Sequence, residues 1–255
     1  MLDTAPDSDT VNVASKSRAR RLLILNVDKV EKIYGAAERA VAAVRGVSFD
    51  LDPGDFVALM GPSGCGKSTL LHMIGGMDQP TRGSVRLGGV ALDSLGEEAL
   101  SKLRRTKIGF VFQFFNLLPT LTVAENVALP LMLNGTRGRD ADIRARLALE
   151  QVGLDARASH FPAELSGGEM QRAAVARSII AGPELLLADE PTGNLDSGNG
   201  EQVMRLLARL NRDLGITIIL ATHSDDAARF ATRTICMRDG LIDRVIEHEG
   251  LLQTL

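Results

Sequence analysis

The chain is short of the residues that mark several protein classes. Its 255 residues include no tryptophan, one tyrosine (Tyr34) and two cysteines. Two cysteines cannot form a disulfide framework, which favours a reducing compartment. No apolar run approaches the roughly 18–20 residues that span a bilayer. These shortages predict a soluble, cytoplasmic chain with few aromatic contact surfaces.

Charge of one sign is not in excess either. Lys and Arg number 29 and Asp and Glu number 32, so the net charge is −3. This mild acidity argues against a protein that coats nucleic acid by charge alone. Apolar residues make up 45% of the chain, which is enough for a core without disulfides or metal.

The hydropathy pattern divides the chain. Residues 1–21 are polar and then basic, without helical or strand periodicity, and predict a disordered tail. Residues 22–250 predict one α/β domain, with an α/β core over 22–113 and 181–250 and a helical insertion over 114–180. Buried strands are expected at 56–60, 184–188 and 216–221, helices at 97–105, 122–134, 139–152, 166–181 and 200–214, and hairpins around 88–89 and 238–240.

A glycine-rich loop lies between the strand at 56–60 and a helix that ends near Ile74. Its sequence, GPSGCGKST, matches G-x-x-x-x-G-K-[ST], and a strand before it and a helix after it are the expected context. Glycines let backbone N–H groups approach a phosphate, and the helix N-terminus adds its positive end. A chance glycine-rich turn is the alternative. The loop residues are Gly61, Pro62, Ser63, Gly64, Cys65, Gly66, Lys67, Ser68 and Thr69.

Two carboxylates follow a later buried strand. The run Leu185-Leu-Leu-Ala ends in Asp189 and Glu190, at the strand end where open α/β sheets bind ligands. Asp189 suits Mg²⁺ and Glu190 suits a base for an attacking water. Taken alone, the pattern also fits a strand that runs into a solvated acidic turn.

A third motif is Leu165-Ser166-Gly167-Gly168-Glu169. Ser166 and Glu169 have the spacing of a capping box that begins a helix. A capping box does not need two glycines, whereas glycines expose the N–H groups of the helix start to a docking phosphate. Capping and phosphate binding are compatible here.

Together these motifs resemble the nucleotide-binding subunit of an ABC transporter. LSGGE between the phosphate loop and the second carboxylate motif is the most specific element, and the resemblance covers nearly all of residues 22–250. Gln113, the turn Asn194-Leu195-Asp196 and His223 recur in the family's order, although each residue alone would be read as structural. The family implies a P-loop NTPase (RecA-like) core, an antiparallel β subdomain and a helical subdomain carrying LSGGE.

The resemblance also implies the roles of single residues. Tyr34 would stack on adenine, and residues Gly61 to Thr69 would wrap the phosphates, with Lys67 on the β- and γ-phosphates. Mg²⁺ would be held by Ser68, Gln113 and Asp189. Glu190 would polarise the attacking water, and His223 would contact the γ-phosphate. Ser166, Gly167 and Gly168 would meet ATP held by a second copy, and Asp196 would communicate across a head-to-tail homodimer with two shared ATP sites.

Two segments narrow the resemblance to one branch of the family. The segments Gln113-Phe-Phe-Asn-Leu-Leu-Pro-Thr and Pro191-Thr-Gly-Asn-Leu-Asp196 resemble the lipoprotein-releasing, macrolide-exporting and cell-division branch (LolD-, MacB- and FtsE-like). The implied function is to hydrolyse ATP and to drive a separate integral membrane permease subunit from the cytoplasmic face of the membrane. We hypothesise that Phe114, Phe115, Leu117 and Leu118 line a groove for a cytoplasmic helix of that partner, with ordinary core packing as the alternative.

The sequence departs from two other classes of protein. A soluble ABC-type ATPase acting on DNA or chromosomes would carry long coiled coils or zinc modules between its halves, and here a compact helical insertion separates Lys67 from Asp189. A non-catalytic subunit would be expected to lose Lys67, Glu190 or the glycines. Cys65 lies near a helix N-terminus, where a thiolate is favoured, and is expected to react with alkylating agents unless ATP protects it. The alternative is a small residue that fills the loop and has no reactivity. Cys236 is expected to be a core residue.

Overall fold

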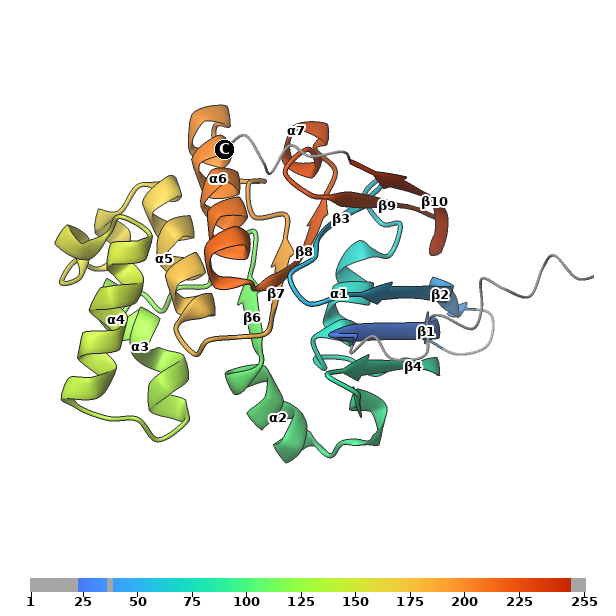
Figure 1. Ribbon diagram of the computed structural model, residues 1–255, viewed down its shortest axis with the longest axis horizontal. Coiled ribbons are helices and arrows are strands. Elements are labelled where there is room, and N and C mark those ends of the chain that lie inside the picture. Colours follow the sequence, from blue (N-terminus) through green and yellow to red (C-terminus); the bar gives the residue numbers. More distant parts are fainter. Residues whose placement is uncertain (1–22, 36–38, 249–255) are drawn as a thin grey trace, which may run out of the picture.

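A computed structural model describes residues 23–35 and 39–248. The expected tail over 1–21 therefore lies outside the described residues. The described chain forms two β-sheets and a group of helices (Figure 1). Among the described residues, no helix has the length and apolar character needed to cross a membrane.

The larger sheet has six strands in the order β10-β9-β3-β8-β7-β6. Strands β9, β3, β8, β7 and β6 pair in parallel, and β10 closes one edge as an antiparallel hairpin with β9. The predicted buried strands at 56–60, 184–188 and 216–221 occupy its centre, so these predictions are confirmed. The bounds are β3 Phe56–Met60, β6 Ile108–Val111, β7 Leu185–Asp189, β8 Thr217–Thr222, β9 Arg233–Arg238 and β10 Leu241–Glu247.

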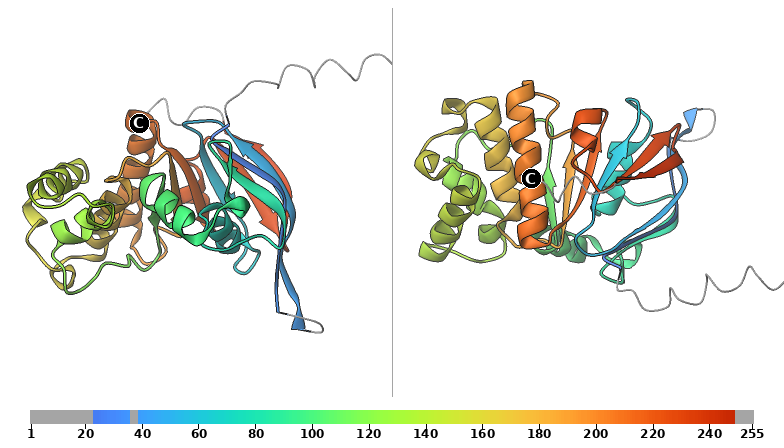
Figure 2. Two further views of the ribbon diagram at one scale, coloured as in Figure 1. Left: turned by 90° about the horizontal axis from the view of Figure 1, so that it is seen from below. Right: turned by 45° about the horizontal axis from the view of Figure 1, so that its top comes forward.

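The smaller sheet is antiparallel, with the order β2-β1-β4-β5. This sheet matches the antiparallel subdomain that the family resemblance implies. Its bounds are β1 Leu25–Tyr34, β2 Val41–Leu51, β4 Arg82–Leu87 and β5 Val90–Ala91. The hairpin predicted around Gly88-Gly89 joins β4 to β5, with Leu87 opposite Val90. The β1–β2 hairpin projects from the body of the molecule (Figure 2).

The helices fall into three places. α1 (Lys67–Ile74) lies between the two sheets, α2 (Glu97–Thr106) leads into β6, and α7 (Asp225–Ala228) follows β8. α6 (Ser197–Leu214) lies between the large sheet and the helical group (Figures 1 and 2). That group consists of α3 (Val123–Leu133), α4 (Arg139–Gln151) and α5 (Gly167–Ile179), with short 3₁₀ turns at Asp155–Arg157 and Pro162–Glu164. A further 3₁₀ turn, Leu92–Ser94, lies between β5 and α2.

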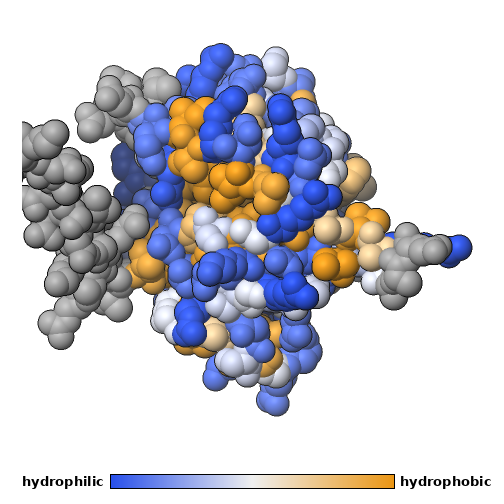
Figure 3. All heavy atoms as spheres, turned by 90° about the vertical axis from the view of Figure 1, so that its right-hand side faces the viewer, coloured by the Kyte–Doolittle hydropathy of each residue, from blue (hydrophilic) through white to orange (hydrophobic). Residues whose placement is uncertain are grey.

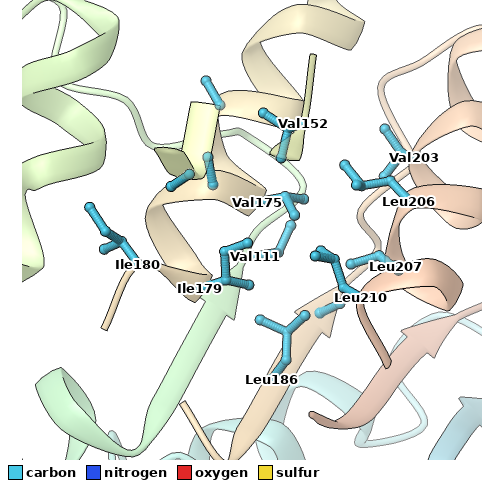
Figure 4. Close-up of a cluster of buried hydrophobic side chains, with 14 of the residues drawn as sticks. Val111, Val152, Val175, Ile179, Ile180, Leu186, Val203, Leu206, Leu207 and Leu210 are labelled. Carbon is cyan, nitrogen blue, oxygen red and sulfur yellow. The ribbon is translucent and has the colours of Figure 1, made fainter. Parts of the chain in front are cut away.

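Alternate residues of the central strands supply two separate cores. Phe56 and Ala58 of β3 face a cluster shared with α3, α4, α5 and α6, whereas Val57 and Leu59 face a cluster shared with α1 and the smaller sheet. A strand buried on both faces needs a continuous apolar run, which explains FVALM. Figure 4 shows the first cluster, in which Val175 and Ile179 of α5 lie near Leu207 and Leu210 of α6.

The face over the strands at the right of Figure 1 carries apolar side chains between charged ones (Figure 3). Strands β1, β2 and β10 contribute exposed apolar residues to the surface of the molecule. Apolar residues scattered on a surface are normal and need no partner to explain them. These residues are Ile33, Tyr34, Val41, Leu241, Val245 and Ile246.

Helix boundaries differ slightly from those predicted. The helix expected at 200–214 begins at Ser197, because Asp196 caps it by accepting the N–H of Asn199 at 2.9 Å. The helix expected at 166–181 spans Gly167–Ile179, with Ser166 as its N-cap. Ends of helices are the least certain part of a sequence-based assignment, because they depend on caps rather than on periodicity.

Candidate functional site

Four neighbouring parallel strands end at one edge of the large sheet. The phosphate loop follows β3, Gln113 follows β6, Glu190 follows β7 and His223 follows β8. Because parallel strands share a direction, their carboxyl ends bring these distant segments together. This edge is the candidate site.

Two glycines of the phosphate loop, Gly61 and Gly66, are packed so tightly against other backbone that a side chain would not fit. A Cβ on Gly61 would lie 2.3 Å from the carbonyl oxygen of Met237, and a Cβ on Gly66 would lie 2.3 Å from that of Ala43. Gly66 also has φ 104, in the region that favours glycine. The loop therefore rests directly on the backbones of β9 and β2.

Lys67 is the first residue of α1 and folds back over the loop. Its side chain is buried, and Nζ donates hydrogen bonds to the carbonyl oxygens of Gly61 (2.7 Å) and Pro62 (3.1 Å). A buried ammonium needs such acceptors. The charge is thereby held within the loop where a phosphate would enter.

Ser68 and Asp189 meet across the strand edge. Ser68 Oγ donates to Oδ1 of Asp189 at 3.1 Å, although the residues are 121 apart in the chain. Burial raises the pKa of Asp189, while the hydrogen bond from Ser68 and the charge of Lys67 act in the opposite direction. A hydroxyl and a carboxylate are hard oxygen ligands of the type that Mg²⁺ prefers.

Glu190 and His223 form a second pair beside the first. Oε1 of Glu190 lies 2.9 Å from Nδ1 of His223, and Thr222 Oγ1 donates to Oε2 at 3.4 Å. Glu190 has φ 47, a left-handed conformation that is unusual for a residue with a side chain. Strained backbone is found where a side chain must be held in one direction, as in many active sites.

Gln113 is joined to the segment after β7. Its Nε2 lies 3.4 Å from Oδ1 of Asn194, and Asn194 Nδ2 donates to the backbone oxygen of Gln113 at 2.9 Å. A Cβ on Gly193 would lie 2.9 Å from Nε2 of Gln113. The structure thus brings Gln113 next to the turn that carries Glu190.

Ser166 forms the predicted capping box. Its Oγ accepts the N–H of Glu169 at 3.3 Å, and Oε2 of Glu169 accepts the N–H of Ser166 at 2.8 Å. The N–H and the hydroxyl of Ser166 both donate to this carboxylate and lower the pKa of Glu169, which Arg157 also pairs at 3.1 Å. The serine that begins α5 is thereby fixed in position.

The starts of α5 and α6 touch each other. A Cβ on Gly168 would lie 2.3 Å from Oδ1 of Asn199, so only glycine fits there without a shift of the asparagine. The N–H of Asn199 lowers the pKa of Asp196, which keeps that carboxylate charged. Ser166, Gly167, Gly168 and Asp196 form a cluster at these helix starts. Figures 1 and 2 place α6 between α5 and α1.

Tyr34 ends β1 and is half exposed. Its hydroxyl donates to Oδ2 of Asp78 at 2.7 Å, and Asp78 lies shortly after the end of α1. The one tyrosine is therefore linked to the helix that the phosphate loop begins. Its ring is available to a flat partner.

The burial of the two cysteines bears on their predicted roles. Cys65 is only 4% exposed, because its sulfur lies beneath the loop beside Gly61. Its carbonyl oxygen accepts the N–H of Gly240 at 3.1 Å. The small loop-filling role fits better than the reactive one. Cys236, expected in the core, is half buried on β9.

Several supporting residues carry no signal in the sequence. Arg177 of α5 donates to the carbonyl oxygens of Phe115 (2.8 Å) and Asn116 (2.5 Å), and both of these residues have positive φ. Asn126 holds the same segment through Leu118. No local pattern links residues about 60 positions apart, so only the fold reveals these contacts. The asparagine at 194 could have been found, since it belongs to the motif that contains Asp196.

Comparisons with known proteins agree with this geometry. Residues 44–193 match the model of the ABC transporter family. The chain is 46% identical over 86% of its length to the lipoprotein-releasing system ATP-binding protein LolD of Geobacter metallireducens, of which it covers 97%. It is also 46% identical over 86% of its length to the macrolide export ATP-binding/permease protein MacB of Chlorobium luteolum, of which it covers 33%. A solved dimeric structure of the ATP-binding cassette MJ0796 of Methanocaldococcus jannaschii, bound to ADP and Pi, superposes with a TM-score of 0.82 at 42% identity, covering 89% of this chain and 100% of the other.

Proposed function

This chain belongs to the ABC transporter family, and we propose that the strand-edge site described above is its ATP-hydrolysing centre. The chain is an ATP-binding, ATP-hydrolysing subunit of the type found in lipoprotein-release and macrolide-export systems. The alternative, a DNA- or chromosome-acting ATPase, receives no support from these relatives.

One observation supports the assignment of the centre most directly. Ser68 and Asp189 meet at 3.1 Å, beside the Glu190–His223 pair at 2.9 Å. The first pair supplies oxygen ligands and the second supplies an oriented base, and both lie where the phosphate loop begins α1. A hydrolytic centre needs these three parts together.

The loop and the first pair are suited to a magnesium nucleotide. The tightly packed glycines, the start of α1 and Lys67 provide N–H groups and positive charge for phosphates. Ser68, Asp189 and Gln113 would hold Mg²⁺. When bound, the ion would neutralise charge on the phosphate oxygens. Lys67 would exchange its loop carbonyls for phosphate oxygens.

The second pair is suited to activating water. Glu190 would accept a proton from water at a carboxylate oxygen. His223 and Thr222 would orient that carboxylate. His223 would also reach the γ-phosphate from the end of β8. Most of the barrier would be lowered by positioning and by charge, as is general for phosphoryl transfer.

A second copy of the chain would complete each site. Ser166, Gly167, Gly168 and Asp196 cluster at the starts of α5 and α6, and α6 lies between α5 and α1. We propose that this cluster faces ATP held by the partner copy. The similar cassette of known structure is described as a dimer.

Mixing two inactive variants tests the shared site. Lys67→Ala removes the phosphate lysine and Ser166→Arg blocks the helix start. In a mixed dimer, one of the two sites has both residues intact. Activity that appears only on mixing supports the proposal, whereas a demonstrated mixed dimer without ATP turnover overturns it.

The helical group would receive the membrane subunit. We propose that residues 114–180 form a helical subdomain and that the described remainder of 22–113 and 181–250 forms the α/β core. Phe114 is 72% exposed and Leu118 44% exposed, at the segment between β6 and α3. Exposed apolar residues that gather in one segment are a feature of docking surfaces. A chain bound in this way would sit on the cytoplasmic face of the membrane.

A further inference from the structure

Three side chains from distant segments converge at the end of β1. Lys32 Nζ lies 2.5 Å from Oδ1 of Asp78, and the hydroxyl of Tyr34 donates to Oδ2 at 2.7 Å. Both oxygens of one carboxylate are thus engaged. Lys32 also donates to the carbonyl oxygen of Gln79 at 2.7 Å and lies 5.0 Å from the centroid of the Tyr34 ring.

These contacts restrict the tyrosine ring in two ways. The carboxylate fixes its hydroxyl, and the ammonium covers one side of the ring by a cation–π contact. Lys32 and Tyr34 are two residues apart on a strand, so their side chains share a face. The Lys32 side chain is 13% exposed and that of Asp78 is 28% exposed, so this pair is better shielded than ordinary surface ion pairs, which constrain little.

Asp78 ties the ring to the phosphate-binding helix. It lies in the turn after α1, where its N–H donates to the carbonyl oxygen of His72 at 3.2 Å. The phosphate loop leads into the other end of α1. Asp78 therefore links Tyr34 to the helix that carries Lys67 and Ser68.

The Lys32–Asp78 pair is not needed to attach β1 to the segment that follows α1. The backbone of β1 is already held here, because Thr81 N–H donates to the carbonyl oxygen of Glu31 at 2.7 Å. Thr81 Oγ1 also accepts the N–H of Ile33 at 3.0 Å. What the charged pair adds is the direction of the tyrosine ring.

We infer that Lys32 and Asp78 are positioning residues, which hold the ring of Tyr34 in register with the phosphate loop and so strengthen binding of the base of a nucleotide. This inference rests on the proposed ATP-hydrolysing function and on the role that the family resemblance implies for Tyr34, which is to stack on that base. A ring held in its bound orientation loses less freedom when a ligand arrives. Neither residue belongs to the phosphate loop.

The spectroscopy of the chain allows a direct test. Since Tyr34 is the only tyrosine and there is no tryptophan, tyrosinate absorbance reports this residue alone. Burial and the hydrogen bond to Asp78 raise the pKa of Tyr34. Asp78→Asn should lower this pKa, over a pH range where circular dichroism shows the fold intact. Glu184→Gln, which breaks the exposed Lys107–Glu184 pair, is the matched control and should leave the pKa unchanged.

The second measurement separates the base from the phosphates. Asp78→Asn and Lys32→Met should each weaken ATP binding about three- to tenfold, the effect of losing one hydrogen bond or cation–π contact. Binding of inorganic tripolyphosphate, which has no base, should stay within twofold of wild type. In the Tyr34→Phe background, Asp78→Asn should have little further effect on ATP affinity, because the hydroxyl through which it acts is gone.

Two results would overturn the inference. An unchanged tyrosine pKa in Asp78→Asn would mean that the carboxylate does not hold the ring. Equal weakening of ATP and tripolyphosphate would mean that the residues act on the loop or the fold instead. Failure of the proposed function looks different: the wild-type chain itself would neither bind nor hydrolyse ATP, even though Asp78→Asn shifts the titration.

Discussion

Nδ1 of His223 lies 2.9 Å from Oε1 of Glu190, although the two residues are 33 apart in the chain. They meet because β7 and β8 are parallel neighbours, with Asp189 opposite Ala221. The N–H of Glu190 also donates to the carbonyl oxygen of Ala221 at 2.9 Å. The carboxylate is therefore fixed by its backbone and by its side-chain partners.

Replacement of this carboxylate tests its role as the base. Glu190→Gln keeps the shape and loses the acceptor for a proton, so we expect ATP binding to persist while turnover falls by ~10²-fold or more. Single-turnover hydrolysis and equilibrium binding separate the two effects. Turnover near the wild-type rate would remove Glu190 from this role.

We expect Lys67→Ala to weaken the binding of ATP. Its ammonium is held by the carbonyl oxygens of Gly61 and Pro62, ready for phosphate oxygens. Loss of a charged hydrogen bond costs roughly 1.5–3 kcal/mol, or about 10- to 100-fold in Kd. Lys107→Ala, at an exposed pair, is the control and should bind ATP normally. Unchanged affinity in Lys67→Ala would contradict the phosphate assignment.

Asp189 links stability to pH. Burial raises the pKa of Asp189 above its ordinary 3.8, so the folded chain holds this proton more tightly than the unfolded chain. Stability of the wild type should therefore fall as pH rises from 3.8 through the raised pKa. Asp189→Asn has no such charge, and we expect it to unfold at a higher Tm at neutral pH without ATP and Mg²⁺, and to lose hydrolysis.

Thermal unfolding across pH checks this expectation. The difference in Tm between the two proteins should disappear below the ordinary pKa, where the wild-type carboxyl is neutral in both states. A variant that is less stable than wild type at neutral pH would show that the charge of Asp189 is compensated in the folded chain.

The two thiols should react in a defined order. Cys65 is 4% exposed beneath the phosphate loop, whereas Cys236 is half buried on β9. We expect Cys236 to be alkylated first in the native chain, and both thiols to react in denaturant. In the folded Cys236→Ser variant, Cys65 is the remaining thiol, and we expect it to be alkylated slowly. Intact-mass spectrometry counts the alkyl groups that are added. Fast, ATP-sensitive labelling of this variant would restore the reactive interpretation of Cys65.

The docking surface is best tested at Phe114. This side chain is 72% exposed, while its neighbour Phe115 is half buried and its carbonyl oxygen is held by Arg177. Phe114→Glu should abolish co-purification with the membrane subunit from detergent extracts, with an unchanged Tm. Leu214→Glu, an exposed apolar residue at the end of α6, is the matched control. Retained complex in Phe114→Glu would place the partner elsewhere.

The sequence alone determined the local parts of this protein. Continuous apolar runs such as Phe56–Met60 identified strands buried on both faces, because each face meets its own core. The loop glycines, the capping box at Ser166 and the order of the motifs identified the family and its ATPase function. All of these are patterns of a few residues, in which neighbours in the chain set the local backbone.

The tertiary structure decided which distant residues meet. That Ser68 touches Asp189, that Asn194 holds Gln113 and that Asp78 binds Tyr34 depends on strand order, since these partners are 121, 81 and 44 residues apart. The sequence could not predict burial either, and the burial of Cys65 favours its loop-filling interpretation over its reactive one. Spacing in the sequence predicts the backbone of a motif, whereas contact and exposure arise only when the sheets and helices pack together.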